Sequence, residues 1–222
     1  ADPVAARLEI AHDARLAALA REPGRDARWR LEIAHGSEGQ TRATTHRGPL
    51  VLAIPGPQAA GLLAAGGIEV PGLDAVSMTP QWTAMAAWET APQSERAVIE
   101  TGGAPLARAV REDAKPGREG PPRWVLHADA AWTAETLDMP HAEAGARLLE
   151  DFARATGREL AAPCHLAVHR WLYARVARPL GRDCHWDATL GLGLAGDWCR
   201  GPGLEAAWES GRALAAAIGS AR

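Results

Sequence analysis

The sequence predicts an α+β fold, and three observations lead to this class. Short segments of apolar or alternating residues recur along the chain, and each has the length of a β-strand. Two longer segments, 142–156 and 204–218, carry apolar side chains at helical spacing. Near the end of the chain, the apolar run 190–195 leads through a glycine-containing turn into the second of these helices. Strands in runs, interrupted by separate helices, favour an α+β protein over an all-helical or all-strand one.

The composition is that of a globular protein with one domain, or one domain and part of another, at 222 residues. Apolar residues make up 47% and charged residues 23%, and the net charge of −3 gives no reason to expect nucleic acid or an anionic membrane as a partner. No apolar run reaches the roughly 18 residues of a membrane span, and the N-terminus does not resemble a signal peptide. We therefore expect a cytoplasmic protein. Since Ala1 replaces an initiator Met, we also expect the chain to begin inside a longer parent.

The three cysteines, Cys164, Cys184 and Cys199, are odd in number and widely spaced, which favours reduced thiols. Two of them precede a histidine, but no C-x-x-C or H-x-x-x-H spacing occurs. Adjacent residues of a strand point to opposite faces, so such a pair could hardly ligate one ion. We expect no metal site. Nine tryptophans against one tyrosine and one phenylalanine indicate a mixture of core packing and a flat ligand-binding surface.

The first quarter of the chain is mostly extended. Residues 4–19 are either two strands joined near His12-Asp13 or a helix, since Ala, Leu and Arg favour helix. Segment 28–33 alternates, and this predicts a strand with Trp29, Leu31 and Ile33 inward, connected by a hairpin at 35–39 to a strand at 41–45. A fully apolar strand at 49–55 then precedes a helix over 57–65, which has proline in its first turn.

The middle of the chain predicts further strands at 78–89, 98–101, 105–111 and 123–128. The loop 112–122 contains Lys115, the only lysine, on a Pro-Gly turn. Since arginine is used everywhere else, Lys115 is either functional or simply a solvated surface residue. Trp132 lies at a plausible helix start. The helix over 142–156 is amphipathic and ends at Gly157, with Ala146, Leu149, Phe152 and Ala153 expected on its buried face.

Segment 164–174 reads as a strand with two different faces. One face carries His165, Ala167, His169, Trp171 and Tyr173, and the other carries Cys164, Leu166, Val168, Arg170, Leu172 and Ala174. Two imidazoles, an indole and a phenol on one face suit the wall of a site for a planar, redox-active ring. A sheet face covered by a helix explains the same pattern, because aromatic residues pack equally well there. Residues 178–187 are expected to form a loop.

The turn after the run 190–195 offers the geometry of an anion-binding site. It begins at Gly196-Asp197, contains Gly201 and Gly203, and opens a helix at Leu204. Free backbone N–H groups and the positive end of the helix dipole favour an anion at such a start. The Asp197 carboxylate can accept hydrogen bonds from sugar or ribityl hydroxyls. The alternative is a tight connection that needs glycine for steric reasons alone. The helix is expected to bury Leu204, Ala207, Trp208, Gly211, Leu214, Ala215 and Ile218.

Several segments resemble the FAD-dependent amine oxidase superfamily, and within it the bacterial renalase-like branch. The run Ala195-Gly-Asp-Trp198 with 203–211 resembles its C-terminal flavin-binding segment, which usually reads Gly-Asp, a short loop, Val-Glu-Gly-Ala and a Ser-Gly. Here Leu204 stands for the valine and Ala206 for the glycine. Similar matches are Ala-x-Pro-x-Pro-Gln-Ala at 53–59, Lys-Pro-Gly-Arg at 115–118, Trp-Thr-Ala-Glu at 132–135 and His-Arg-Trp-x-Tyr-Ala at 169–174. In the last of these, Leu172 replaces a second arginine of the family.

The resemblance implies a flavoenzyme that takes a hydride from an amine or a dihydronicotinamide-type substrate and passes the electrons to O2, with FAD as the cofactor. It implies a mostly antiparallel mixed sheet of about six strands with helices on one face, as in the substrate domain of p-hydroxybenzoate-hydroxylase-like flavoenzymes, plus the last strand and helix of the FAD domain. Residues 1–55 would start the substrate domain and return to the FAD domain, 56–187 would form the substrate domain, and 188–222 would be the C-terminal part of the FAD domain. The implied cofactor-binding residues are Gly196, Asp197, Trp198, Gly203, Leu204, Glu205, Ala206 and Ala207. The implied substrate-side residues are Lys115, His169, Trp171 and Tyr173.

One part of the family pattern is missing. The Gly-x-Gly-x-x-Gly fingerprint that binds the ADP half of FAD is not found in a turn between a strand and a helix. Gly191, Gly193 and Gly196 have its spacing, but the run 190–195 is predicted to be the strand itself and not a helix-opening turn. The resemblance maps onto about the C-terminal two-thirds of the family. We therefore expect a truncated enzyme whose partner is the missing N-terminal FAD-binding segment. A non-catalytic binding or interaction domain is the competing interpretation.

Overall fold

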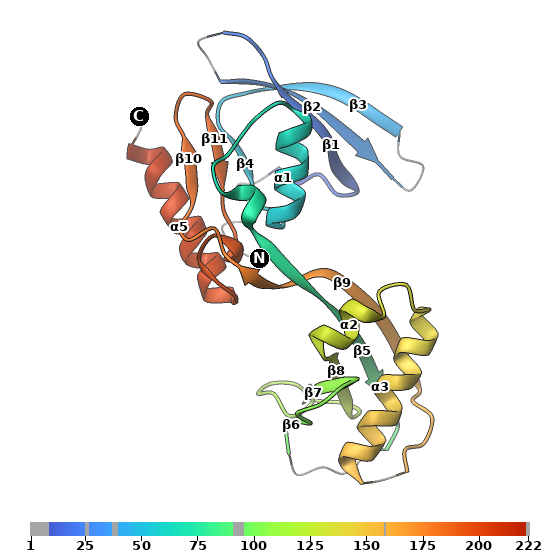
Figure 1. Cartoon of the computed structure of the whole chain (residues 1–222). Coiled ribbons are helices and arrows are strands. Elements are labelled where there is room, and N and C mark those ends of the chain that lie inside the picture. The colour runs from blue at the N-terminus through green and yellow to red at the C-terminus, as the bar shows by residue number, and fades with distance from the viewer. Residues whose placement is uncertain (1–8, 25–26, 37–39, 91–95, 158, 221–222) are drawn as a thin grey trace. The chain divides into compact units, whose positions relative to one another are not determined.

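The computed structural model describes residues 9–24, 27–36, 40–90, 96–157 and 159–220. The chain divides into two compact units. Unit 1 combines the residues up to Ser77 with those from Val176 onward, and unit 2 runs from Met78 to Arg175. The boundaries fall inside two strands, β5 (Ser77–Ala87) and β9 (His165–Arg178), which carry the chain from one unit to the other (Figure 1). Each unit is described by itself.

Unit 1 contains an antiparallel sheet of β1 (Ala14–Arg21), β2 (Arg28–His35) and β3 (Gln40–Arg47), in the order β1-β2-β3. Trp29 of β2 is fully buried, while Leu31 and Ile33 are half-buried. The hairpin predicted between 28–33 and 41–45 is therefore confirmed. The helix considered for the opening segment is wrong over β1, because pairing with β2 holds these residues extended. The first strand of the alternative strand pair falls largely in residues 1–8, outside the described part of the chain.

The second sheet of unit 1 brings together segments far apart in sequence. Its order is β10-β11-β4, and it pairs β11 (Leu192–Leu194) in parallel with β4 (Leu50–Leu52) and antiparallel with β10 (His185–Asp187). Every residue of β11 is buried, as expected for an apolar run in the middle of a sheet. The strand β10 corrects the loop expected over 178–187. Its three residues form a strand because β11 supplies their hydrogen-bonding partners, which no local pattern reveals.

Helices and turns complete unit 1. The helix α1 (Gly56–Ala65) follows β4, with proline in its first turn as predicted, and the 3-10 helix η2 (Leu73–Ala75) follows α1. The short helix α4 (Asp197–Arg200) follows β11, and α5 (Leu204–Ser220) ends the described chain. None of the helices in the described part of the chain has the length and apolar character needed to cross a membrane.

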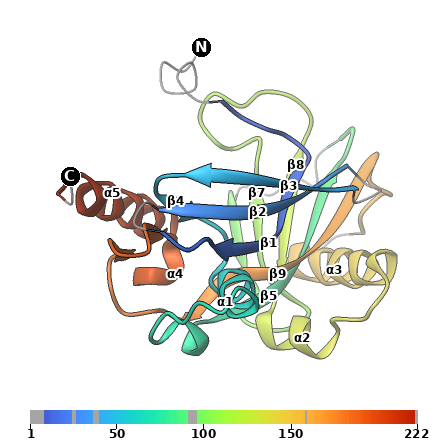
Figure 2. The same cartoon turned by 90° about the horizontal axis from the view of Figure 1, so that it is seen from above.

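Unit 2 is built on one sheet with the order β6-β7-β8-β5-β9. Its other strands are β6 (Val98–Glu100), β7 (Leu106–Arg111) and β8 (Arg123–Ala128), and the pairs β6–β7, β7–β8 and β8–β5 are antiparallel. Two helices, α2 (Ala130–Glu135) and α3 (His141–Thr156), pack on the same side of this sheet (Figure 2). Among the described residues the sheet has five strands, whereas about six were expected.

The core of unit 2 lies between this sheet and α2 and α3. Trp82, Trp124, Leu148 and Phe152 are fully buried there, and the Trp124 and Phe152 ring centroids are 4.9 Å apart. The Trp82 indole N–H donates to the carbonyl of Thr136 at 3.2 Å, which satisfies its polar atom inside the core. Several of the tryptophans are therefore core residues, one of the two roles expected from their number.

Two helices turn a different face inward from the one predicted. In α3 the buried residues are Ala144, Gly145, Leu148, Asp151 and Phe152, so Phe152 is confirmed, whereas Ala146 is exposed and Leu149 and Ala153 are only half-buried. Gly145 faces the sheet because an added Cβ would lie 2.7 Å from the Val168 side chain. Asp151 is buried because its carboxylate accepts the backbone N–H of Leu106 at 3.0 Å. A glycine and an acid at inward positions shift the face from the one that apolar spacing indicates.

In α5 the buried residues are Ser210 and Leu214. Leu204 is 89% exposed and Trp208 is 68% exposed, so neither belongs to the packed face as predicted. Gly211 and Ala215 are exposed as well, while Ala207 and Ile218 are half-buried. The helix packs through a serine because the hydroxyl of Ser210 accepts a backbone N–H from the turn after β11.

Candidate functional site

The turn after β11 lies at the edge of unit 1 where two parallel strands end. β4 leads through Ile54-Pro55 into α1, and β11 leads through Gly196 into α4 and then α5. The carboxyl ends of parallel strands meet at one edge, and open α/β sheets bind ligands at that edge. The predicted cofactor-binding segment therefore begins at a position suited to a ligand.

Trp198 joins these two strand ends. Its indole is 1% exposed, and its Nε1–H donates to the carbonyl of Ile54 at 2.9 Å. Gly56, at the start of α1, packs against the same ring, since an added Cβ would lie 3.1 Å from the Trp198 Cδ2 atom. The side chain therefore fixes the two turns together, and any contact that Trp198 makes with a cofactor would come from its backbone.

Gly196 is required by this packing. A Cβ at this position would lie 2.4 Å from Nε1 of Trp198 and 2.7 Å from its Cδ1. The backbone of Gly196 is extended, with φ at 163°, so the constraint is the space that the indole occupies and not the backbone conformation. Its carbonyl accepts the N–H of Cys199 at 3.1 Å, which begins the turn of α4.

Ser210 anchors the turn to α5. The Gly196 N–H donates to its hydroxyl oxygen at 3.1 Å, and the Ser210 side chain is fully buried. The same hydroxyl also hydrogen-bonds with the Cys199 thiol. Burial raises the pKa of that thiol, and the Ser210 hydrogen bond opposes the rise only in part. The sequence offered Ser210 as part of a Ser-Gly motif, but its bond to Gly196 could not be predicted because the two residues are brought together by the fold.

Asp197 and the start of α5 remain accessible. Asp197 is half-buried at the start of α4, and no group in the described residues donates a hydrogen bond to its carboxylate. Gly203, Leu204 and Glu205 are exposed, and Ala206 and Ala207 are half-buried. In the first turn of α5 the Ala207 N–H donates to the carbonyl of Gly203 at 3.2 Å. The N–H groups before Ala207 therefore have no acceptor within the helix. The helix therefore starts at an exposed position, and its first N–H groups have no acceptor among the residues that the structure describes.

Arg200 holds the short helix between these features in place. Its guanidinium pairs with Glu209 of α5 at 2.7 Å and with Asp183 at 2.5 Å. Backbone bonds reinforce this arrangement, because the carbonyl of Trp198 accepts the Leu180 N–H at 2.8 Å. The turn from Gly196 to the start of α5 is thus tied to its surroundings by backbone and side-chain contacts.

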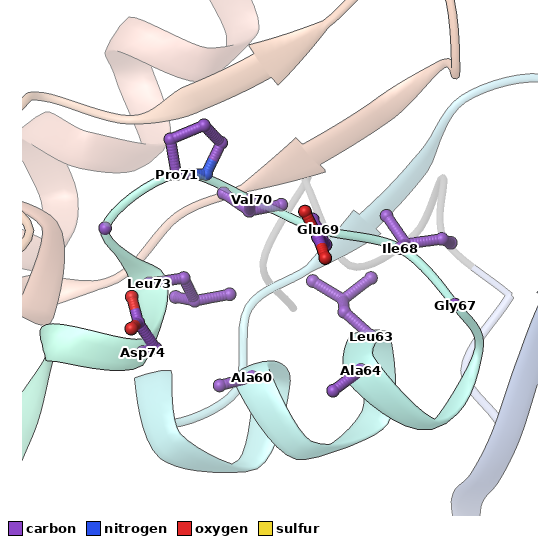
Figure 3. Close-up of a pocket in the computed structure, with 11 residues that line it drawn as sticks. Ala60, Leu63, Ala64, Gly67, Ile68, Glu69, Val70, Pro71, Leu73 and Asp74 are labelled. Carbon is purple, nitrogen blue, oxygen red and sulfur yellow. The ribbon is translucent and has the colours of Figure 1, made fainter.

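Two cavities of unit 1 are lined by other residues. One, of about 900 Å³, lies among β1, β2, β4 and α1, and its lining is mostly apolar, including Leu16, Leu31, Ile33, Val51, Ile54 and Leu62. The other, of about 540 Å³, lies between α1 and the segment leading to η2, where Leu63, Ile68, Val70 and Leu73 are joined by Glu69 and Asp74 (Figure 3). None of the residues predicted to bind cofactor or substrate lines either cavity.

In unit 2, β9 alternates as predicted. Leu166 and Val168 face α3, where both lie beside Gly145, and the Arg170 guanidinium lies 5.7 Å from the Trp82 ring centroid in the core. Their neighbours His169 and Trp171 therefore point to the opposite face, whereas further along the strand Leu172 is exposed and Tyr173 is half-buried. The rings of His169 and Trp171 are 4.1 Å apart with an interplanar angle of 57°. The alternative of an aromatic face covered by a helix is wrong within unit 2, since α2 and α3 cover the other face.

A row of polar residues that was not predicted from the sequence crosses the same face. Register pairs Arg108 of β7 with His127 of β8, and His127 with Thr83 of β5. The row faces away from the helices because the next residues along these strands, Ala109, Leu126 and Ala84, are buried in the core. The alternation within segment 123–128 could have predicted that His127 lies on this face, because Trp124, Leu126 and Ala128 occupy the other one.

His127 lies in a cationic environment. Its Nδ1 is buried, and no group in the described part of the chain forms a hydrogen bond with it. Burial lowers the pKa of its imidazole, Arg108 lowers it further, and weaker contributions come from Glu112, which raises it, and from Arg175 and Lys115, which lower it. His127 is therefore held neutral to a lower pH than an ordinary histidine.

Lys115 belongs to an ordered loop. Its ammonium pairs with Glu112 at 2.5 Å, and Arg118 pairs with the second oxygen of the same carboxylate. Asp113 closes the loop by accepting from Arg111 at 2.7 Å and from the Arg123 N–H at 3.0 Å. Burial raises the pKa of Asp113, but these hydrogen bonds outweigh it and the pKa is lowered. The charges of Glu112 and Lys115 both act on the pKa of His127.

The predicted site residues thus form two groups in two units. Gly196, Asp197, Trp198 and 203–207 gather around one turn of unit 1. Lys115, His169, Trp171 and Tyr173 belong to unit 2. Their assignment to cofactor and substrate stays a prediction, as does the division into segments 1–55, 56–187 and 188–222.

No family model matches the sequence. The structure is similar to a protein from Exiguobacterium sp. 255-15 described as a protoporphyrinogen oxidase, with 17% identity and a TM-score of 0.67 over 93% of this chain and 47% of that one. It is also similar to cyclohexylamine oxidase from Brevibacterium oxydans IH-35A, with 15% identity and a TM-score of 0.56 over 86% of this chain and 46% of that one. Putrescine oxidase with bound putrescine matches with 11% identity and a TM-score of 0.59, over 93% and 48%. The chain spans about half the length of these structures, and it has the fold of that half.

Proposed function

We propose that this chain is part of an FAD-dependent oxidoreductase of the amine oxidase kind, and that the turn from Gly196 to Ala207 forms half of its flavin site. The observation that carries this proposal is the combination found at one strand end. The carboxylate of Asp197, which has no ion-pair partner among the described residues, lies next to an open helix start at the carboxyl edge of two parallel strands. The fold shared with half of several oxidases supports the same function.

The residues of the turn have separate tasks in this proposal. Asp197 accepts hydrogen bonds from ribityl hydroxyls, and the free N–H groups at the start of α5 donate to the electron-rich pyrimidine edge of the ring. Trp198 and Ser210 hold the turn in the shape that presents these groups. When bound, the flavin accepts a hydride from a C–H next to nitrogen and passes the electrons to O2. The chain contributes binding and orientation.

The other half of the flavin site would come from a segment with the glycine fingerprint. The mostly apolar cavity of about 900 Å³ beside β4 supports this, because it opens next to a strand at the end of its sheet. Val51 of β4 is exposed there. A strand or helix of the ADP-binding segment would cover these side chains, as hydrophobic burial requires. The protein would then consist of unit 2 as the substrate domain and of a completed cofactor domain built on unit 1.

Finer assignments rest on the resemblance. The Lys-Pro-Gly-Arg of 115–118 and the His-Arg-Trp-x-Tyr-Ala of 169–174 favour the renalase-like branch, in which a dihydronicotinamide-type compound would replace an amine as the substrate. The cytoplasm is the proposed location, and the three unpaired thiols support it.

A flavin titration tests the proposal. The purified chain is mixed with FAD, and bound flavin is followed by its visible absorbance and by the quenching of its fluorescence. We expect weak but saturable binding, reduced about tenfold by Asp197→Asn because a charge-assisted hydrogen bond is lost. Asp138→Asn is the matched control, since Asp138 is an exposed carboxylate of unit 2. Absence of binding at millimolar FAD, or equal loss in both variants, would favour the non-catalytic binding domain instead.

A further inference from the structure

We propose that the sheet face of unit 2 opposite α2 and α3 binds an anionic group, a carboxylate or a phosphate, carried on a planar ring. Arg108 and His127 would hold the anion, with the charge of Lys115 in support, and Trp171 with His169 would contact the ring. If the flavin function is correct, this face selects the substrate, which would be an anionic ring compound and not a simple cationic amine. The anion site itself can be tested without flavin.

Strand register places the row. Arg108, His127 and Thr83 are direct neighbours on β7, β8 and β5, so their side chains stand side by side on one face. The aromatic pair of β9 shares that face, because Arg170 between them contacts the Trp82 ring in the core. β9 is the neighbour of β5 in the sheet order. Cation, imidazole and hydroxyl therefore succeed one another across β7, β8 and β5, and the aromatic pair lies on β9, the next strand of the same sheet.

The charges near His127 are mostly positive. Arg108, Arg175 and Lys115 all act on His127, whereas Glu112 is the one carboxylate with an opposing effect on it among the described residues. That carboxylate already holds Lys115 and Arg118. Three arginines (Arg108, Arg175 and Arg118) and Lys115 against the carboxylates of Glu112 and Glu100 leave a net positive potential on this face. Such a surface attracts an anion and repels an ammonium group.

Two groups of the row can be reached by a ligand, because Arg108 is exposed and His127 is half-buried, whereas Thr83 is 5% exposed and only flanks His127. His127 has a buried Nδ1 without a partner among the described residues, and such an atom loses its hydrogen bond to water with no replacement. Both nitrogens of a protonated imidazole are donors, so a bound carboxylate or phosphate would accept a hydrogen bond from the accessible part of the His127 ring. Arg108 is paired with Glu100 at 3.0 Å, but their side chains are 51% and 65% exposed. Since exposed ion pairs contribute little, Arg108 can exchange Glu100 for a ligand.

The ring half of the site follows from the aromatic pair. Trp171 is exposed on β9, although burial of its indole would be favourable. An exposed indole 4.1 Å from an imidazole offers a flat surface on which another ring can stack. We therefore expect the aromatic pair to make ring-bearing anions bind more tightly than inorganic anions.

The test titrates four probes into the folded chain: benzoate, phenyl phosphate, inorganic phosphate and benzylamine. The imidazole signals of His127, assigned with His127→Asn, are followed by NMR. We expect benzoate and phenyl phosphate to shift these signals and to raise the pKa of His127, because an adjacent anion favours the protonated ring. Benzylamine should bind at least about tenfold more weakly than benzoate, since like charges repel. Phenyl phosphate should bind more tightly than inorganic phosphate.

Arg108→Gln should weaken benzoate binding about three- to tenfold, because a charge-assisted contact is lost. Arg147→Gln is the matched control, since Arg147 is also an exposed arginine paired with a glutamate and lies on α3. If Arg108→Gln does not fold, Lys115→Gln replaces it. The proposal is overturned if His127 does not respond, if benzylamine binds as well as benzoate, or if the control weakens binding equally. Equal binding of inorganic and phenyl phosphate overturns the ring part. A positive anion result without FAD binding would leave the site standing and count against the flavin function alone.

Discussion

The Trp198 indole N–H donates a 2.9 Å hydrogen bond to the carbonyl of Ile54 and so connects the turn after β11 to the turn after β4. These residues are far apart in sequence, and the bond joins the two segments from which the proposed flavin site begins. Since the indole is buried, both its packing and its hydrogen bond contribute to the stability of unit 1. Changes at this contact should therefore affect folding and flavin binding together.

Replacing Trp198 should be strongly destabilising. Trp198→Ala removes a buried indole and leaves the Ile54 carbonyl without its donor, so we expect a loss of about 3–5 kcal/mol in the free energy of unfolding. Urea denaturation followed by circular dichroism measures this loss. Trp208→Ala is the control, because Trp208 is 68% exposed and should change stability by less than about 0.5 kcal/mol. Similar losses in both variants would contradict the packing described for Trp198.

Gly196→Ala should be destabilising although the backbone there is unstrained. The new methyl group would lie 2.4 Å from the indole Nε1, so the ring must move, and we expect a cost of about 1–3 kcal/mol. Gly211→Ala provides the opposite case, because nothing lies within 4 Å of an added Cβ at this position in α5. Alanine favours helix over glycine, so this variant should gain about 0.5–1 kcal/mol. Denaturant midpoints of the two variants should thus move in opposite directions.

Ser210→Ala tests the link between the turn and α5. The Gly196 N–H would lose its acceptor, which should cost about 1–3 kcal/mol. Flavin binding should weaken as well, because the turn is less firmly held. Ser220→Ala, at the exposed end of the same helix, removes a hydrogen bond to Ala216 and should have little effect. A Ser210→Ala protein as stable as the parent would show that the bond to Gly196 is not needed.

The stability of the fold should fall as the pH drops below about 6.5. Burial lowers the pKa of His127 and also of His185, where Arg182 adds to the effect and Asp187 opposes it. The unfolded chain therefore takes up protons below the ordinary histidine pKa of 6.5, while the folded chain does so only at lower pH. The stabilisation is complete above 6.5 and is lost as the pH falls through the folded pKa values.

Urea midpoints at a pH of about 7.5 and about 5.5 measure this dependence. His127→Asn should reduce the difference between the two midpoints, whereas substitution of the exposed His12 by Asn should leave it unchanged. Asp113 does not interfere, because its pKa is lowered from 3.8 and it stays charged in this range. A midpoint that rises toward pH 5.5 would contradict the neutral, buried state of these imidazoles.

Local patterns predicted the strands and helices well where one face is apolar. The alternation of β9 and the run of β11 are visible in the residues themselves, because each strand has a fixed period of two. β10 was missed since three residues among loop-forming neighbours become a strand only by pairing with β11. The face of α3 was misjudged because Gly145 and Asp151 are buried for reasons of shape and hydrogen bonding, which apolar spacing does not report.

The candidate sites, like the fold, could be predicted from the sequence only where they depend on residues adjacent in the chain. The turn at Gly196-Asp197 could be found from its glycines and from the resemblance, since both depend on residues adjacent in sequence. Ser210 and the row of Arg108, His127 and Thr83 could not, because strand order and helix packing bring them together. Leu204 was expected to be buried on the strength of its apolar side chain, yet an exposed helix start is what a ligand site at this position requires.

Amide mapping by NMR during an FAD titration tests the flavin site most directly. Each backbone N–H of the labelled chain gives a separate signal, so the signals that shift show where FAD binds. We expect the largest shifts at the amides of Gly196, Asp197 and 203–207, and we expect Asp197→Asn to diminish them. Shifts confined to the apolar cavity beside β4, or no shifts at saturating FAD, would contradict this expectation.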